Sequence, residues 1–196
     1  MALKKPLKLL FVNNRSKFAK NIIAAIKKRK IPFETATVLR STLKKIDVRE
    51  FDCAIMSGGP DTNWKRKSRY NGEILEKFKN KPVLGICLGH EFIVEHYGGK
   101  IEKLEKKIQG FDQIKIFRKS GLSGDRKTLR AYKAHQNDTR YLPKTLTNFA
   151  SSKLCKIEMV KHKKRQHFGV QFHPEKSGRD GDLIFDNFFK ICGESK

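Results

Sequence analysis

The chain has 196 residues, of which 38% are hydrophobic, which is enough for one domain with its own core and no disulfide staples. Its formal net charge is +24, but the basic residues are spread along the chain with no recognition-helix pattern and no RNA-binding aromatic signature. We therefore expect a solvated basic surface or docking on an acidic protein. Nucleic acid is not an expected partner, nor is a membrane, since no apolar run approaches the roughly 20 residues that cross a bilayer.

The first half of the chain alternates strand patterns with helix patterns. An apolar run at residues 7–12 predicts a strand, and Ser16 then offers an N-cap to a helix with Ile22 and Ile26 on one side. Further strands are predicted at residues 33–39, 51–56 and 82–86, and a helix at residues 91–97. This alternation favours an α/β fold with a mostly parallel central sheet and helices on both faces, in which sites form at the carboxyl ends of strands.

The second half changes character. Strands joined by turns are predicted at residues 113–118, 129–134, 155–162 and 167–172, and a last helix at residues 182–192. These strands suggest antiparallel additions to the sheet. No internal repeat, low-complexity block or linker divides the sequence, so we expect a single domain that spans residues 1–196.

Cys87 stands where the strand at residues 82–86 turns into a helix. Backbone amides and the helix dipole stabilise a thiolate at such a turn, and Gly85 and Gly89 leave room for a tight elbow like that of hydrolases. Cys87 is therefore a candidate nucleophile. A small buried hydrophobe is the alternative, and it is our interpretation of the other three cysteines. The cysteines lack zinc-site spacing and no signal-peptide pattern precedes the first strand, so we expect a reduced, cytoplasmic protein without a metal.

A candidate base follows the strand at residues 167–172, in the stretch FGVQFHPEKSG. His173 can take a thiol proton and return it to a leaving amine, while Glu175 can hold the imidazole through its other ring nitrogen. Pro174 restrains the turn between them. Because Cys87 and His173 both follow predicted strands, they can share one site. An ordinary histidine at a strand end is the alternative.

Three motifs in this order resemble those of the class I glutamine amidotransferases, the triad glutaminases. GICLGHE at residues 85–91 is similar to the family's nucleophile motif, GVQFHPE at residues 169–175 to its His and Glu motif, and SGGP at residues 57–60 to its oxyanion loop. The resemblance covers nearly the whole chain. It implies the family's flavodoxin-like α/β fold and a reaction in which glutamine is hydrolysed to release ammonia.

Carried over by position, the resemblance implies a role for each motif residue. Cys87 would attack the side-chain amide of glutamine to give a γ-glutamyl thioester. His173 would shuttle the proton and Glu175 would hold His173 in place. The backbone N–H groups of Gly59 and Leu88 would form the oxyanion hole for the charge that develops on the amide oxygen.

Gly58 and Glu91 are the expected substrate-binding positions. Gly58 lets the backbone approach closely, although a plain tight turn is the alternative. Glu91 stands where the family usually carries a glutamine that contacts the amino acid end of the substrate. A carboxylate there accepts from the α-ammonium but repels the α-carboxylate by about 4 kcal/mol before relaxation, a penalty that protonation or a nearby Lys would remove. Glu91 also resembles the γ-glutamyl hydrolases of a related cysteine peptidase family, so that activity is an alternative, as is a noncatalytic partner-binding subunit.

Within the family, the flanking sequence is most similar to the separate glutaminase subunits of archaeal-type GMP synthases. The similarity lies in CKIEMVKHKKRQHFGVQFHPE, in KICG and in AYKAHQNDTRYLP, whose His135 and Asp138 either sense the partner or form an ordinary polar pair. It implies L-glutamine as substrate and, as partner, an ATP-pyrophosphatase (synthetase) subunit that aminates XMP to GMP. We expect no cofactor in this chain, and ATP and Mg on the partner. HPEKSG is also similar to the glutaminase subunit of imidazole glycerol phosphate synthase, an alternative that ranks lower.

Overall fold

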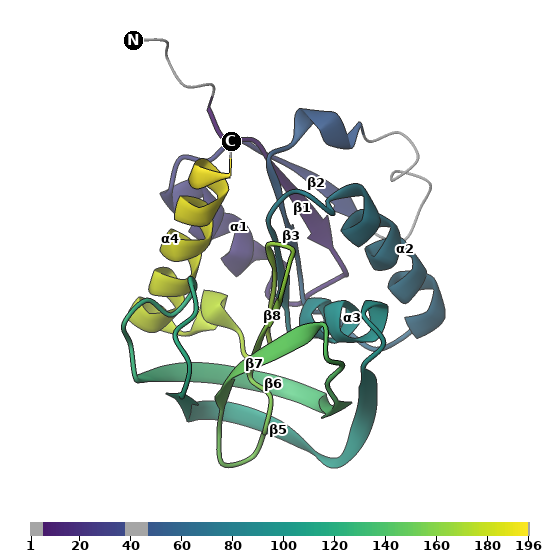
Figure 1. Ribbon diagram of the computed structural model, residues 1–196, viewed down its shortest axis with the longest axis vertical. Helices are drawn as coiled ribbons and strands as arrows, with labels where there is room; N and C mark the ends of the chain where they lie inside the picture. Colours follow the sequence, from purple (N-terminus) through teal and green to yellow (C-terminus); the bar gives the residue numbers. More distant parts are fainter. Residues whose placement is uncertain (1–5, 38–46, 196) are drawn as a thin grey trace.

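The computed structural model describes residues 6–37 and 47–195, and within them the strands form one mixed sheet (Figure 1). The strands are β1 (Leu9–Asn13), β2 (Phe33–Thr37), β3 (Cys53–Met56), β4 (Val83–Ile86), β5 (Lys100–Ile116), β6 (Thr128–Tyr141), β7 (Leu146–Ser151), β8 (Met159–His162) and β9 (His167–Val170). The helices are α1 (Ala19–Lys28), α2 (Trp64–Lys77), α3 (Leu88–His96) and α4 (Gly178–Glu194), with short 3-10 helices at Val48–Glu50 and Pro174–Lys176.

The strand order across the sheet is β2-β1-β3-β4-β9-β8-β7-β5-β6. The first five strands of this order are parallel, with β1 between β2 and β3, and β4 between β3 and β9. Strands β3, β4 and β9 are buried along their whole length, as expected of parallel strands that are covered on both faces. The remaining pairs are antiparallel, so the expected mixed α/β sheet is confirmed.

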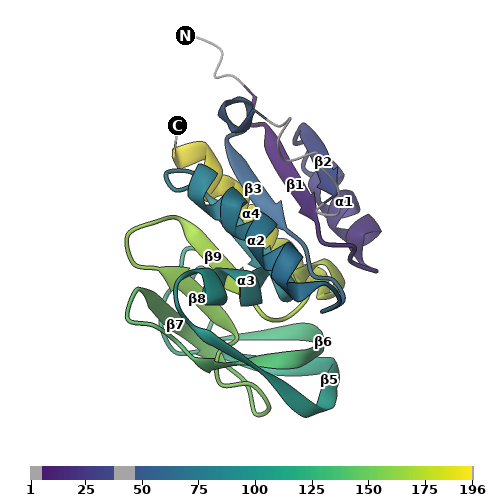
Figure 2. The same cartoon turned by 90° about the vertical axis from the view of Figure 1, so that its right-hand side faces the viewer.

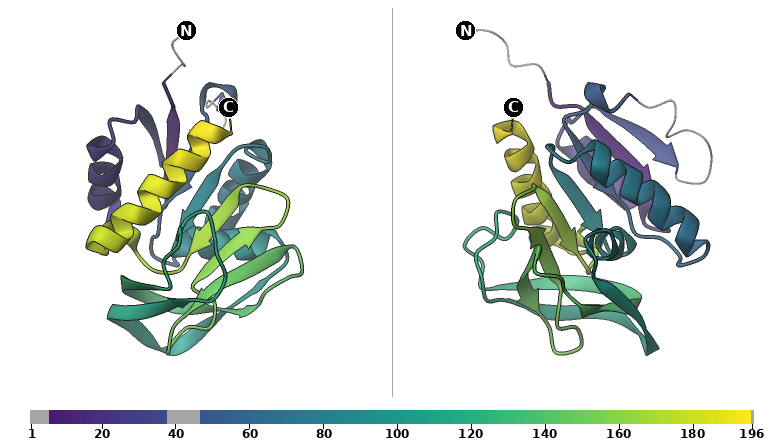
Figure 3. Two further views of the ribbon diagram at one scale, coloured as in Figure 1. Left: turned by 60° about the vertical axis from the view of Figure 1, so that its left-hand side comes forward. Right: turned by 45° about the vertical axis from the view of Figure 1, so that its right-hand side comes forward.

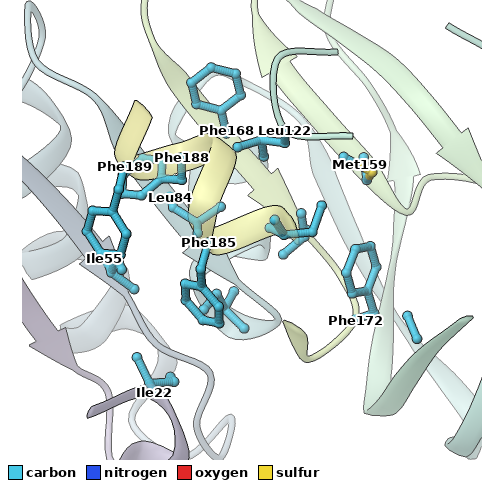
Figure 4. Close-up of a cluster of buried hydrophobic side chains, with 14 of the residues drawn as sticks. Ile22, Ile55, Leu84, Leu122, Met159, Phe168, Phe172, Phe185, Phe188 and Phe189 are labelled. Carbon is cyan, nitrogen blue, oxygen red and sulfur yellow. The ribbon is translucent and has the colours of Figure 1, made fainter. Parts of the chain in front are cut away.

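Helices cover both faces of the parallel part of the sheet. Figure 3 shows α1 and α4 on one face, and α2 and α3 on the other. Ile22 of α1 and Phe185 of α4 belong to one buried cluster with Leu84 of β4 (Figure 4). Ile74 of α2 and Ile93 of α3 belong to a second cluster. Within the described ranges, no helix is both long and apolar enough to cross a bilayer.

Strands β5 and β6 form a long hairpin that passes beyond the carboxyl ends of the parallel strands (Figures 1 and 2). Its register sets Phe111 opposite Tyr132 and Ile108 opposite His135. An isolated bridge joins Tyr132 to His173, which follows β9. The hairpin therefore flanks the carboxyl ends of the parallel strands, which is where the motif residues lie.

The hairpin is also where the expected strand boundaries are wrong. β5 begins at Lys100 and not at residue 113, and β6 continues to Tyr141. Most of the additional β5 residues are exposed and about half of them are charged, so they carry no apolar alternation that could reveal a strand. β7 was not expected, and the strand expected at residues 155–162 is reduced to β8. Residues 38–39, at the expected end of β2, lie outside the described residues.

Three helix starts also differ from expectation, and one of them is that of α4, which begins at Gly178 and not at residue 182. α1 begins at Ala19 without a side-chain cap, because the Ser16 hydroxyl accepts from the N–H of Phe18 in the turn that precedes the helix. α3 begins at Leu88, directly after Cys87, and not at residue 91. The earlier start brings the candidate nucleophile to the helix N-terminus itself.

Candidate active site

The elbow that presents Cys87 is strained and closely packed. Cys87 has φ 51° and ψ −107°, a positive φ that non-glycine residues rarely adopt. Its N–H donates to the carbonyl of Val170 in β9 at 2.8 Å. A Cβ added at Gly85 would lie 2.4 Å from the carbonyl oxygen of Gly89, and one added at Gly89 would lie 2.3 Å from that of Met56. The two glycines are therefore required for the turn.

His173 and Glu175 form a buried pair at the start of the 3-10 helix Pro174–Lys176. The Nδ1 atom of His173 lies 2.8 Å from Oε1 of Glu175, and both side chains are buried. A Cβ added at Gly58 would lie 3.2 Å from Cε1 of His173 and 3.4 Å from Cβ of Cys87. The sulfur-bearing and imidazole side chains therefore meet at one point, against the loop that follows β3. The structure brings together the three residues that the motifs indicated.

The protonation of this group differs from the sequence-based expectation. Burial raises the pKa of the Cys87 thiol, whereas the turn at the helix start was expected to stabilise a thiolate. Burial alone lowers the pKa of His173, but the negative charges of Cys87 and Glu175 outweigh it and raise that pKa to about 10. A thiolate and an imidazolium thus stabilise each other, and proton loss from Cys87 is coupled to proton gain by His173.

The SGGP loop after β3 is fixed from both ends. A Cβ added at Gly59 would lie 2.2 Å from the carbonyl oxygen of Asn14, so the backbone passes there without room for a side chain. The side-chain amide of Asn14 donates to the carbonyl of Ser57 at 2.9 Å. At the other end, the buried ammonium of Lys67 on α2 donates to the carbonyl of Pro60 at 2.5 Å. These contacts hold the Gly59 peptide beside the elbow.

Glu91 is buried one helical turn after Cys87, and both of its carboxylate oxygens accept hydrogen bonds. Oε1 accepts from Nε2 of Gln171 and Oε2 from Nδ2 of Asn137, each at 3.1 Å. Burial raises the pKa of Glu91. The hydrogen bonds from the two amides act against burial and stabilise the charged form of Glu91. Among the described residues, no lysine or arginine lies in ion-pair distance of this carboxylate. Sequence reasoning missed both amide residues, although Gln171 lies inside the GVQFHPE motif.

These residues surround one cavity of about 470 Å³. It is lined by Cys87, His173, Glu91, Gly59, Leu88 and Phe18, by the basic residues Arg15, Lys17 and Lys107, and by His135 and Asn137 of β6. The structure separates the two polar residues flagged in β6, because Asp138 accepts from the Cys155 thiol at 3.1 Å while His135 faces the cavity. The basic residues of the lining were not indicated by any sequence motif.

Comparison with known proteins gives independent evidence on the family to which the chain belongs. The sequence model of the family "Glutamine amidotransferase class-I" matches residues 10–192. The chain is 38% identical over 144 residues to a GMP synthase (glutamine-hydrolyzing) subunit of Thermococcus kodakarensis, covering 71% of this chain and 75% of the relative. It is 33% identical over 189 residues to the protein of the same name in Methanococcus vannielii, covering 94% and 97%.

Two solved structures share the fold. The structure described as a GMP synthase subunit protein from Thermoplasma acidophilum is 24% identical, with a TM-score of 0.89 over 98% of this chain and 96% of the other. A glutamine amidotransferase from Thermotoga maritima is 15% identical, with a TM-score of 0.71 over 97% and 85%. With the family match spanning nearly all of the sequence, the chain belongs to the class I glutamine amidotransferase family.

Proposed function

We propose that this chain is the glutaminase subunit of a two-subunit GMP synthase. It would hydrolyse L-glutamine through a thioester on Cys87 and deliver ammonia to a separate synthetase subunit. The observation that carries this proposal is the meeting of Cys87 with the hydrogen-bonded pair of His173 and Glu175 at one cavity. The relatives named as glutamine-hydrolyzing GMP synthase subunits support the choice of acceptor.

The chemistry follows from the positions of these groups. His173 takes the proton of Cys87, and the sulfur attacks the carboxamide carbon of glutamine to give a tetrahedral intermediate. The N–H groups of Gly59 and Leu88 stabilise the oxyanion; the N–H of Leu88 is free of a helical partner because it begins α3. As the intermediate collapses, His173 gives its proton to the departing ammonia. Water, activated by the same imidazole, then hydrolyses the thioester to release glutamate.

Glu91 supplies the contact to the amino acid end of the substrate. Its carboxylate, held by the two amides, accepts from the α-ammonium of glutamine. The basic residues Arg15, Lys17 and Lys107 line the same cavity and offset the repulsion between Glu91 and the α-carboxylate. The surrounding charge therefore compensates for the residue that departs from the family's usual glutamine.

The acceptor half of the reaction belongs to the partner. An ATP-pyrophosphatase subunit would activate XMP with ATP and Mg²⁺, and the ammonia released here would convert it to GMP. No cofactor is assigned to this chain, because every chemical step above uses its own side chains and backbone.

The test is ammonia release from L-glutamine by the purified chain and by its Cys87→Ala variant, each with and without the organism's GMP synthase ATP-pyrophosphatase subunit, ATP, Mg²⁺ and XMP. We expect activity that depends on Cys87, and GMP formation from glutamine only when both subunits are present. Glutaminase activity without GMP formation would reject the acceptor. No turnover of glutamine in any mixture would reject the function.

The buried carboxylate of Glu91 favours one second candidate, a γ-glutamyl hydrolase. The measurement that separates the two is the ratio of kcat/KM for γ-glutamyl peptides to that for glutamine, determined on the isolated chain. A ratio above one would favour the hydrolase. The Glu91→Gln variant sharpens the comparison, because it restores the residue usual in amidotransferases and should favour glutamine further.

A further inference from the structure

An aromatic and arginine-rich patch lies on the β5–β6 hairpin and the start of α4, outside the catalytic cavity. Phe111 is 50% exposed, although its ring is large and apolar. The Arg130 guanidinium carbon lies 4.1 Å from the centroid of that ring, and the ring of Tyr132 meets it edge-on at 5.5 Å. We call Phe111, Arg126, Arg130, Tyr132 and Arg179 the Phe111 patch. Exposed aromatic rings framed by arginine are the side chains most enriched at the centres of protein interfaces.

The Phe111 patch is hollowed and positively charged. All of its members except Tyr132 line a groove of about 400 Å³ together with Ser177, Gly178 and Asp180. The one carboxylate of this groove is already engaged, since Asp180 accepts from the backbone N–H of Arg130 at 2.7 Å and lies 3.8 Å from Arg126. Within the described part of the chain, Arg130 and Arg179 have no carboxylate in ion-pair distance. A partner for this groove would therefore bring its own acidic side chains.

The patch is connected to the catalytic histidine through Tyr132. The carbonyl of Tyr132 accepts from the N–H of His173 at 2.8 Å, and its N–H donates to the Ser177 hydroxyl at 3.0 Å. Its ring lies 6.0 Å from that of Phe18, which in turn packs edge-on against His173 at 4.8 Å. Phe18 also lines the catalytic cavity. A protein seated on the Phe111 patch would therefore sit next to the cavity and against the strand that holds His173.

We propose that the Phe111 patch is the docking site for an acidic surface segment of the synthetase subunit. The proposal rests on the proposed function, which requires ammonia to pass from this cavity to a second protein. Carboxylates of the synthetase would pair with Arg130 and Arg179, while an apolar side chain between them would cover Phe111. The location beside Phe18 and His173 places the partner where it can receive ammonia before water dilutes it.

The test uses charge reversal with a matched control. Arg69 on α2 also stacks on an aromatic ring, with its guanidinium carbon 5.0 Å from the centroid of Tyr70. However, α2 and α4 cover opposite faces of the sheet (Figure 3). We expect Arg130→Glu to weaken the affinity for the synthetase by about tenfold or more, and Arg69→Glu to change it by less than about twofold. Affinity is measured by calorimetry with the full-length chains in the presence of ATP, Mg²⁺ and XMP.

A second variant separates contact from long-range attraction. Phe111→Ser keeps the charge, so its loss of affinity should persist at an ionic strength at which the effect of Arg130→Glu has diminished. Equal losses for Arg130→Glu and Arg69→Glu, or no loss for Arg130→Glu, would overturn the proposal. So would wild-type chains that fail to bind the synthetase but self-associate or bind RNA through this patch.

Glutamine hydrolysis and synthetase binding, measured separately, distinguish a wrong docking site from a wrong function. Glutamine hydrolysis by the isolated chain reports on the cavity alone, and Arg130→Glu should leave it within about twofold of wild type, because Arg130 does not line the cavity. An isolated chain that hydrolyses glutamine but docks elsewhere would reject only the Phe111 patch. A wild-type chain that hydrolyses no glutamine, either alone or together with the synthetase and its substrates, would reject the function on which the patch depends.

Discussion

The parallel strands and the β5–β6 hairpin differ both in how they are buried and in what they bring to the site. Strands β3 and β4 are buried throughout, and the loops at their carboxyl ends carry the SGGP stretch and Cys87. Most residues of the hairpin are exposed or half-buried, yet it places His135 and Asn137 at the same cavity. Under the proposed function, the chemistry belongs to the buried half of the fold, whereas the hairpin supports the substrate contact through Asn137 and carries the proposed partner contact.

This division has a kinetic consequence. Changes in the loops after the parallel strands should lower kcat, since those loops meet the reacting atoms. Changes in the hairpin should raise KM or weaken partner docking while leaving kcat nearly intact. Kinetics of variants in the two regions therefore test whether catalysis and binding are divided between them in this way.

The largest effect is expected for Gly59→Ala. The added Cβ would lie 2.2 Å from the carbonyl oxygen of Asn14, so the peptide must move and its N–H no longer faces the substrate. Removing one oxyanion donor costs about 10²–10³-fold in kcat. Steady-state glutaminase kinetics measures the loss, with KM changing little.

Gly72→Ala is the matched control for this variant. Gly72 lies within α2, where an added Cβ would make only an ordinary 3.4 Å contact with His96. We expect unchanged kinetics and a gain in the free energy of unfolding of about 0.5–1 kcal/mol, because alanine favours the helix. Equal kinetic losses at the two glycines would show that the loop has no special role.

The catalytic half of the site was predictable from the sequence, because short apolar strands between glycine-rich turns reveal where a parallel strand ends. That pattern located Cys87 and His173, and the motif spacing added Glu175. It could not reveal that burial would raise the pKa of Cys87, since the depth of the elbow depends on how β9 and α3 pack around it.

The hairpin half was not predictable to the same degree. Asn137 reaches Glu91 across 46 residues of sequence, and that contact depends on a hairpin register with a shift near Lys103 that no local pattern encodes. Lys107 lies in a run of charged residues that resembles an ordinary solvated surface. Gln171 could have been flagged, because it lies inside the GVQFHPE motif directly after β9.

A smaller effect is expected for Asn137→Ala in the hairpin. The change removes the amide that donates to Oε2 of Glu91, and so weakens the hold on the carboxylate that faces the α-ammonium. We expect KM for glutamine to rise about tenfold, while kcat stays within about twofold. Asn148→Ala is the control, since Asn148 donates to the carbonyl of Lys156 and does not line the cavity.

The pH dependence of this variant gives a second readout. Burial already raises the pKa of Glu91, and the bond from Asn137 counteracts that rise. Because the ionised form binds the α-ammonium, kcat/KM should fall as the pH falls through this raised pKa. Asn137→Ala should move that acid limb to higher pH, and Glu91→Gln should remove it. An acid limb that is identical in all three proteins would contradict the role of Glu91.

The smallest effect, and the one that tests the junction between the two regions, concerns stability in acid. His90 of α3 is buried against the hairpin, with Nε2 3.2 Å from the Thr139 hydroxyl, and burial lowers its pKa to about 3. The unfolded chain binds a proton at this residue below about pH 6.5 that the folded chain excludes until about pH 3. The free energy of unfolding should therefore fall with decreasing pH in this window, by up to about 1.4 kcal/mol per pH unit for this histidine.

Chemical denaturation between pH 7 and pH 4 measures this slope. His90→Gln cannot take up the proton, so its stability should depend less steeply on pH than that of the wild type, even if its stability at pH 7 is lower. His96→Gln is the control, because His96 is partly exposed and its ring pairs with Glu76 of α2 at 2.9 Å. A slope that is unchanged in His90→Gln would mean that the hairpin separates from α3 before the rest of the chain unfolds. The two regions would then be independent in stability as well as in function.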